Sequence, residues 1–263
     1  MNQGDPVSTI FDLSGKTAFV TGASSGLGTR FARVLAENGA HVVLASRREE
    51  RLKELRAEIE AAGGAASVVQ LDVTDTASIG SAVQEADERT GGIDILVNNS
   101  GVSTTTRLVD VTEQDYDFIF DTNTKGAFFV AQAVALNMIK RAKDRPEQQS
   151  RIVNIASMAG LKVLSQIGTY CMSKAAVVQM TKAMALEWGR YGINVNAICP
   201  GYIRTEINDH HWETEPGQRL IQMLPRKRLG KPEDLDGLLL LLCSDQSSFI
   251  NGGIIAADDG FGV

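Results

Sequence analysis

The sequence predicts an α/β fold, in which a doubly wound, parallel, seven-stranded sheet lies between two layers of helices. Short runs of β-branched and other apolar residues alternate with longer amphipathic stretches, and this alternation indicates successive βαβ units. Two of the runs, residues 93–97 and 152–155, are apolar with little alternation. Such runs are typical of strands that helices cover on both faces, as in parallel sheets.

The strands and helices follow from these runs in order. Strands are expected at residues 17–21, 41–46, 67–71, 93–98, 151–156, 193–199 and 253–257. The clearest helix is residues 48–62, which has Leu52, Leu55 and Ile59 on one face. Glu49 and Glu50 in its first turn complement the helix dipole, and two glycines follow its end.

Two segments differ from simple amphipathic helices. Residues 125–140 are apolar on nearly every face, so more than the sheet must bury them. A subunit interface and the cover of neighbouring helices are both open explanations. Residues 205–224, with His210, His211 and Trp212, have no firm periodicity. A long irregular segment after a strand predicts a lid or binding loop.

Composition narrows the class of protein. The 263 residues carry a net charge of −6, which argues against a protein that mainly grips nucleic-acid phosphates. Three scattered cysteines and no Cys/His cluster predict neither disulfides nor a metal site, and adjacent His210 and His211 do not face one metal easily. No segment has the apolar length of a signal peptide or a membrane span. We therefore expect a cytoplasmic protein that does not insert into a membrane.

The first predicted strand leads into a glycine-rich turn, Gly22, Ser24, Ser25, Gly26, Leu27 and Gly28. Gly22 would allow a tight turn, Gly26 a close approach of backbone N–H groups to a pyrophosphate, and Gly28 close packing of helix on sheet. A purely structural turn is the alternative. The position at the first strand-to-helix junction favours a dinucleotide site.

The end of the second strand bears on the choice of cofactor. Dinucleotide folds place an acidic residue there for the adenosine ribose, or a basic residue for a 2′-phosphate. This chain has Ser46, Arg47 and Arg48 and no carboxylate. The pattern favours NADP(H) over NAD(H), although both arginines could also be solvated residues at a helix start.

A candidate reaction centre follows the fifth strand. Tyr170 and Lys174 are four residues apart on a predicted helix, so both side chains can point into one site. A nearby cation stabilises phenolate and lowers the pKa of a tyrosine. Ser157 comes directly after the buried strand that precedes them. Residues at the carboxyl ends of parallel strands commonly contact the ligand in such folds.

Taken together, these motifs resemble the short-chain dehydrogenase/reductase family over about residues 16–260. The motifs occur in the family's order: the glycine turn at 21–28, Asp72 and Val73, the Asn-Asn-Ser-Gly run at 98–101, Asn123, Ser157, Tyr170 with Lys174, and Pro200 with Gly201. The family's usual alanine is Ser100 here, which removes no functional group.

The resemblance implies a single Rossmann-like NAD(P)-binding domain over residues 1–263, with a substrate lid at 205–224. Tyr170 would be the general acid/base, Ser157 would hold the substrate oxygen, Lys174 would lower the Tyr170 pKa and hold the nicotinamide ribose, and Asn123 would keep its helix open for a proton-relaying water. Further cofactor contacts would come from the strand ends: Asp72, Val73, Asn99, Ser100, Gly101, Pro200, Gly201, Ile203 and Thr205.

The expected activity is NADP(H)-dependent interconversion of a ketone and a secondary alcohol of a small molecule. A 3-oxoacyl thioester reductase is the alternative within the enzyme class, and Arg226, Lys227 and Arg228 would attract such an anionic substrate unless they form a solvated basic turn. A non-catalytic nucleotide sensor or scaffold is the alternative from another class. The resemblance also implies a homotetramer built through helices 125–140 and 170–188.

Overall fold

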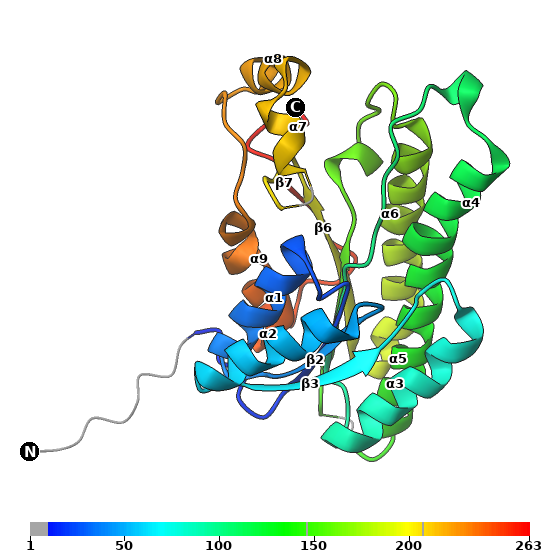
Figure 1. The fold of residues 1–263 in the computed structure, drawn as a ribbon. Coiled ribbons are helices and arrows are strands. Elements are labelled where there is room, and N and C mark those ends of the chain that lie inside the picture. Colours follow the sequence, from blue (N-terminus) through cyan, green and yellow to red (C-terminus); the bar gives the residue numbers. More distant parts are fainter. Residues whose placement is uncertain (1–9, 146, 207) are drawn as a thin grey trace, which may run out of the picture.

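The structure is a computed structural model that describes residues 10–145, 147–206 and 208–263. The expectations for residues 1–9 and for position 207 of the lid lie outside the described residues. The described residues form one parallel sheet with the strand order β3-β2-β1-β4-β5-β6-β7. Figure 1 shows this sheet with its flanking helices. The predicted doubly wound, parallel, seven-stranded sheet is therefore confirmed.

The strands lie close to their predicted bounds. They are β1 (Thr17–Thr21), β2 (His41–Ser46), β3 (Ala65–Gln70), β4 (Ile95–Asn98), β5 (Ser150–Ile155), β6 (Ile193–Pro200) and β7 (Ile254–Ala257). The largest differences are at two strand starts. Strand β3 begins two residues early because Ala65 already pairs with His41. Strand β4 begins two residues late, after Asp94, whose carboxylate accepts the Thr17 N–H at 2.9 Å.

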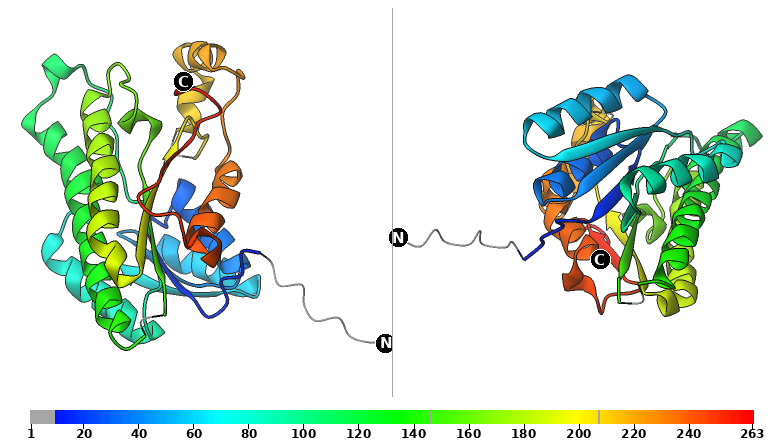
Figure 2. Two further views of the ribbon diagram at one scale, coloured as in Figure 1. Left: turned by 180° about the vertical axis from the view of Figure 1, so that it is seen from behind. Right: turned by 90° about the horizontal axis from the view of Figure 1, so that it is seen from below.

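Helices cover both faces of the sheet. They are α1 (Gly26–Glu37), α2 (Glu49–Ala61), α3 (Thr76–Thr90), α4 (Glu113–Phe120), α5 (Ala127–Ala142), α6 (Gly168–Trp188), α7 (Asp209–Glu213), α8 (Glu215–Met223) and α9 (Asp236–Cys243). Figure 2 shows α1, α2 and α9 on one side of the sheet, with α3, α5 and α6 on the other. Among the described residues, no helix has the length and apolarity to cross a bilayer.

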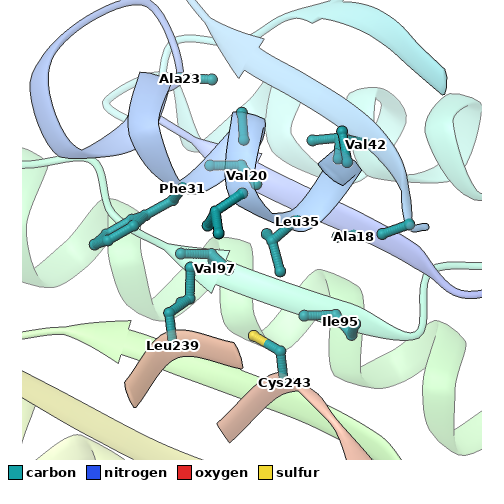
Figure 3. Close-up of a cluster of buried hydrophobic side chains, with 14 of the residues drawn as sticks. Ala18, Val20, Ala23, Phe31, Leu35, Val42, Ile95, Val97, Leu239 and Cys243 are labelled. Atoms are coloured by element: carbon teal, nitrogen blue, oxygen red, sulfur yellow. The ribbon is translucent and has the colours of Figure 1, made fainter. Parts of the chain in front are cut away.

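Each face of the sheet has its own core, because successive strand residues point to opposite faces. In β1, Ala18 and Val20 pack in one cluster with α1 and α9, while Phe19 packs in the other with α3 and α5. Figure 3 shows the first cluster, in which Phe31 and Leu35 of α1 meet Leu239 of α9. All five residues of β1 are buried, as expected for a strand covered twice.

The strand order reverses between β1 and β4, since β2 and β3 lie on one side of β1 and β4 to β7 on the other. In open α/β sheets such a switch point opens a crevice beyond the carboxyl ends of the strands. The glycine turn follows β1 and the Asn-Asn-Ser-Gly run follows β4. Both predicted cofactor motifs therefore lie at this crevice.

The predicted lid is more regular than its sequence indicates, because α7 and α8 occupy most of it. The Thr214 hydroxyl caps α8 by accepting the Gly217 N–H at 3.2 Å. Trp212 is buried, and its indole N–H donates to Asn208 at 2.9 Å. Both helices are too short for a periodic pattern to predict, and contacts around one buried tryptophan stabilise them.

Helix α5 is only partly covered by its own chain. Val130, Ala131 and Val134 are buried, but Phe129 and Leu136 are exposed. The all-round apolarity of this helix is therefore not explained by the sheet and neighbouring helices of one chain.

Candidate active site

The glycine turn adopts a conformation that depends on its glycines. Gly22 and Gly26 have φ of +66° and +54°, in the left-handed region that side chains disfavour. A Cβ on Gly28 would lie 2.2 Å from the Gly22 carbonyl oxygen, so only glycine permits this close packing. Gly26 and Gly28 belong to the first turn of α1, which begins at Gly26. The free N–H groups of such a helix start fit a phosphate.

Thr21 joins the glycine turn to the β4 end and was not singled out from the sequence. Its hydroxyl accepts the N–H groups of Asn99 at 2.9 Å and Ser100 at 3.0 Å, and the Asn99 side chain donates to its carbonyl at 3.0 Å. These bonds hold the two motifs side by side. The only sequence signal for Thr21 is a hydroxyl at the last position of a buried strand.

The two arginines after β2 have different positions. The Arg48 guanidinium donates to the hydroxyls of Ser24 at 3.1 Å and Ser25 at 2.6 Å, so it lies over the glycine turn. Ser46 accepts the Arg48 N–H at 3.1 Å. Arg47 is exposed and lies 3.9 Å from the Asp72 carboxylate. Of the two predicted arginines, Arg48 is therefore the one whose guanidinium lies beside the glycine turn.

Asp72 and Val73 lie just beyond β3. Asp72 accepts hydrogen bonds from the Thr74 N–H at 3.0 Å and the Thr74 hydroxyl at 2.8 Å, so it also caps the local turn. Val73 packs against the turn that contains Gly126, since a Cβ there would lie 2.5 Å from the Val73 carbonyl oxygen. Val73 thereby links the β3 end to the Asn123 region.

Tyr170 and Lys174 lie in the first two turns of α6, and Ser157 begins the segment after β5. Lys174 is buried, and its ammonium donates to the Ile155 carbonyl at 2.8 Å. The same nitrogen lies 5.8 Å from the centre of the Tyr170 ring. The Ser157 hydroxyl accepts the Ala159 N–H at 3.1 Å. The structure therefore brings these three predicted residues together at one end of β5.

The electrostatics of this centre differ from the sequence-based expectation. Burial raises the pKa of Tyr170, and a hydrogen bond with Ser157 opposes that rise. Burial also lowers the pKa of Lys174 to about 8. In the structure, desolvation is the largest effect on the pKa of Tyr170 and outweighs the opposing hydrogen bond with Ser157. The two shifts have opposite directions, so they move the pKa values of Tyr170 and Lys174 apart from their ordinary values of 10.0 and 10.5.

Asn123 lies on a π-helical turn, Asp121–Gly126, between α4 and α5. Its side-chain oxygen accepts the Val102 N–H at 2.7 Å, and its amide donates to the Val102 carbonyl at 2.8 Å and the Ser173 hydroxyl at 3.0 Å. Such π turns are frequent at functional sites. Asn123 thus ties the segment after Gly101 to the helix that carries Tyr170. Ser173, fully buried beside Lys174, is a further residue that sequence reasoning missed.

The segment after β6 completes the crevice. Gly201 donates to the Ala257 carbonyl at 3.0 Å, and Ile203 is buried. The Thr205 N–H donates to the Asn208 side chain at 2.8 Å. A cavity of about 700 Å³ is lined by residues that include Ser24, Gly26 and Thr205. The beginning of the predicted lid therefore faces the glycine turn across a hollow.

These residues fit a nicotinamide dinucleotide. The glycine turn offers backbone N–H groups and a cationic neighbour, and a Cβ on Gly101 would lie 3.3 Å from the Lys174 nitrogen, so glycine keeps that approach open. His210 and His211 are exposed on α7, apart from this set. Over residues 10–145, 147–206 and 208–263, no group of three His, Cys, Asp or Glu side chains is arranged to hold a metal.

The fold and this site define a dinucleotide-fold oxidoreductase, and comparison with known proteins gives the family. The family model described as enoyl-(acyl carrier protein) reductase matches residues 22–262. Gluconate 5-dehydrogenase of Gluconobacter oxydans is 38% identical over 255 residues, which are 97% of each chain. NAD-dependent glycerol dehydrogenase of Listeria innocua is 36% identical over 253 residues, 96% of each chain.

A solved structure adds a cofactor complex. Gluconate 5-dehydrogenase from Burkholderia cenocepacia, in complex with NADP and tartrate, superposes with a TM-score of 0.90 at 36% identity, covering 95% of this chain and 96% of that one. The chain belongs to the short-chain dehydrogenase/reductase family, as its motif order indicates. Its relatives are sugar and polyol dehydrogenases, which supports oxidoreductase chemistry on an alcohol/ketone pair.

Proposed function

We propose that this protein is an NADP(H)-dependent oxidoreductase that interconverts a ketone and a secondary alcohol, with Tyr170 as general acid/base. The observation that carries the proposal is the meeting of Tyr170, Lys174 and Ser157 at the end of β5, with Asn123 bonded to the adjoining segment. A nucleotide sensor or scaffold has no use for this set of proton-bearing groups beside the cofactor crevice.

The cofactor supplies or accepts the hydride at the reacting carbon. In the reductive direction Tyr170 donates its phenolic proton to the substrate oxygen, and in oxidation the phenolate removes the proton from the alcohol. The Ser157 hydroxyl donates a hydrogen bond to the same oxygen. Lys174 brings a positive charge that favours the phenolate and offers donors to ribose hydroxyls. Asn123 holds the loop and helix that frame these groups.

Two features support NADP(H) as the cofactor. Arg48, which follows β2, donates to the hydroxyls of Ser24 and Ser25 in the glycine turn, and no carboxylate ends that strand. Planar guanidinium is well suited to phosphate. One relative is crystallised with NADP, and another is an NAD-dependent glycerol dehydrogenase.

We propose a polyol or sugar-derived ketone as the substrate class, following the names of the relatives. The segment around Thr104, whose hydroxyl has no hydrogen-bond partner among the described residues, is a further part of the proposed pocket. This segment lies against the one that separates Ser157 from Tyr170, since the Thr106 N–H donates to the Gln166 carbonyl at 2.8 Å. The whole chain, residues 1–263, would act as one nucleotide-binding domain with residues 205–224 as the substrate lid.

We also propose a homotetramer built through α5 and α6. Phe129 and Leu136 of α5 and Leu186 of α6 are exposed, and apolar patches of this kind mark interfaces. A cavity of about 720 Å³ runs between α4, α5 and α6 and is lined by residues that include Phe128, Met180 and Trp188.

The decisive test of the activity is Tyr170→Phe, with Tyr191→Phe as the matched control. Tyr191 lies beyond the other end of α6, where Arg190 donates to its hydroxyl. We expect Tyr170→Phe to lower kcat by roughly 10²–10⁴-fold, the range for loss of a general acid/base, while NADPH still binds. Unchanged turnover in Tyr170→Phe would refute the mechanism.

The substrate class is tested by following NADPH absorbance with ketoses, simple ketones, steroid ketones and β-ketoacyl thioesters. Preferential turnover of ketoses supports the proposal. Preference for the thioesters instead would favour the 3-oxoacyl reductase, to which the description of the matching family model also points.

A further inference from the structure

Three aromatic side chains from distant parts of the chain meet beyond the catalytic residues. Tyr202 follows Gly201, Trp212 belongs to α7, and Phe261 lies in segment 258–263. The Tyr202 ring centre is 5.6 Å from that of Trp212 and 5.4 Å from that of Phe261, both in edge-to-face geometry. Figures 1 and 2 show this last segment beside α7 and α8. The lid and the last segment therefore share one aromatic contact.

This cluster adjoins the segment that carries Ser157. Lys162 belongs to the segment that begins with Ser157. Its ammonium donates to the Phe261 carbonyl at 3.1 Å and lies 4.9 Å from the centre of the Phe261 ring. Phe261 is thus bound to the segment that carries Ser157, one of the residues of the reaction centre.

Segment 258–263 is held in a defined shape. Asp259 accepts hydrogen bonds from Arg228 at 2.7 and 3.2 Å and from Arg226 at 3.1 Å. Its φ of +56° is unusual for a residue with a side chain. The Asp258 carboxylate accepts the N–H groups of Gly260 at 3.1 Å and Gly262 at 2.7 Å. Arg226 and Arg228, in the basic turn after α8, therefore bind this segment.

We propose that segment 258–263 forms the outer wall of the substrate pocket, that Phe261 sets the length of substrate that the enzyme accepts, and that Asp259 positions Phe261. The inference rests on the proposed function, because it assigns the pocket to Tyr170 and Ser157. Phe261 is half-buried, so its ring has a free part to meet the carbon chain that extends from the reacting ketone. A smaller side chain there would make room for further carbons.

The kinetic test compares Phe261→Ala with wild type on ketoses of three to six carbons, from dihydroxyacetone to fructose. We expect the ratio of kcat/KM for fructose to that for dihydroxyacetone to rise roughly tenfold or more, the size of effect seen when a pocket gains space for added carbons. Phe249→Ala is the control, because Phe249 is fully exposed before β7. A change of less than about twofold in Phe261→Ala, on a scale where tenfold is expected, would overturn the proposal.

A second measurement does not depend on turnover. Hydrogen exchange is followed in Asp259→Asn and in Glu215→Gln, which weakens an exposed ion pair with Arg219 within α8. We expect Asp259→Asn to raise exchange in segment 258–263 and around Tyr202, with no change there in Glu215→Gln. Equal protection in Asp259→Asn and wild type would show that Asp259 does not position the wall.

The Tyr170→Phe and Phe261→Ala experiments distinguish a failure of this inference from a failure of the proposed function. If Tyr170→Phe loses turnover as expected but Phe261→Ala leaves the ketose ratio unchanged, the wall is refuted and the activity stands. If wild type reduces none of the ketoses, simple ketones, steroid ketones or thioesters, the proposed function fails together with the substrate wall. The exchange result then still decides whether Asp259 fastens the segment.

Discussion

The Lys174 ammonium donates a hydrogen bond to the Ile155 carbonyl at 2.8 Å, which links helix α6 to the last residue of β5. Ser157 follows two residues later. One buried cation thus sets the distance between the helix that carries Tyr170 and the segment that carries Ser157. This arrangement costs free energy, because burial disfavours the charged form of Lys174 and lowers its pKa to about 8.

The first prediction concerns stability and pH. The pKa of Lys174 falls from an ordinary 10.5 to about 8, so the unfolded chain binds more protons than the folded one between these pH values. The contribution of Lys174 to stability therefore improves as pH rises through this window, and below pH 8 its burial costs about 3 kcal/mol. We expect Lys174→Met to be at least as stable as wild type at pH 7 and less stable near pH 10, where the hydrogen bond to Ile155 is the main loss.

Denaturant unfolding of the cofactor-free protein at both pH values measures this difference. Lys182→Met is the control, since Lys182 is exposed on the same helix. A Lys174→Met variant whose stability follows the pH profile of wild type would contradict the prediction.

The second prediction concerns the glycine turn. Gly28→Ala would place a Cβ 2.2 Å from the Gly22 carbonyl oxygen, and the backbone has to shift. We expect a loss of more than about 2 kcal/mol of stability, as for overpacking at a close contact, together with loss of NADPH binding by calorimetry. Gly80→Ala, at an exposed position of helix α3, meets no atom within 4 Å and should raise stability by about 0.5–1 kcal/mol. Similar effects of both substitutions would show that the turn tolerates a side chain.

The third prediction separates the two arginines after β2. We expect Arg48→Ala to raise KM for NADPH roughly tenfold or more, as for loss of a charged hydrogen bond of about 1.5–3 kcal/mol, and to change KM for NADH little. Arg47→Ala should have the smaller effect, because Arg47 is exposed and lies near Asp72. Arg56→Ala on the outer face of α2 is the control. Equal NADPH preference in wild type and in both variants would refute a phosphate role for this pair.

The fourth prediction tests the assembly. Leu136→Glu adds a charge to the exposed apolar face of α5, and burying an unpaired charge in an interface is unfavourable. We expect light scattering to report a smaller species than the tetramer proposed for the wild type. Val109→Glu, at an exposed site outside α5 and α6, should leave the mass unchanged. A monomeric wild type would contradict the tetramer outright.

Much of the fold could be predicted because it follows from local sequence patterns. The bounds of β1 and β2 agree with the sequence-based ranges, since both are continuous apolar runs between glycines and polar residues. The order of the motifs gave the family. Helices α7 and α8 could not be predicted, because their stability depends on packing around Trp212 and on bonds such as that from Gln218 to the Trp212 carbonyl at 2.6 Å.

The sequence by itself determined the fold class, the family and the positions of Tyr170, Lys174 and Ser157, because spacing along a helix and position at a strand end are local properties. Only the tertiary structure decided that Arg48 lies over the glycine turn, that Thr21 and Ser173 support the site, and that burial raises the pKa of Tyr170. Contacts such as that of Phe261 with Lys162 join segments 99 residues apart, and desolvation depends on every element that packs around a group. Neither the long-range contacts nor the desolvation can be predicted from a local stretch of the sequence.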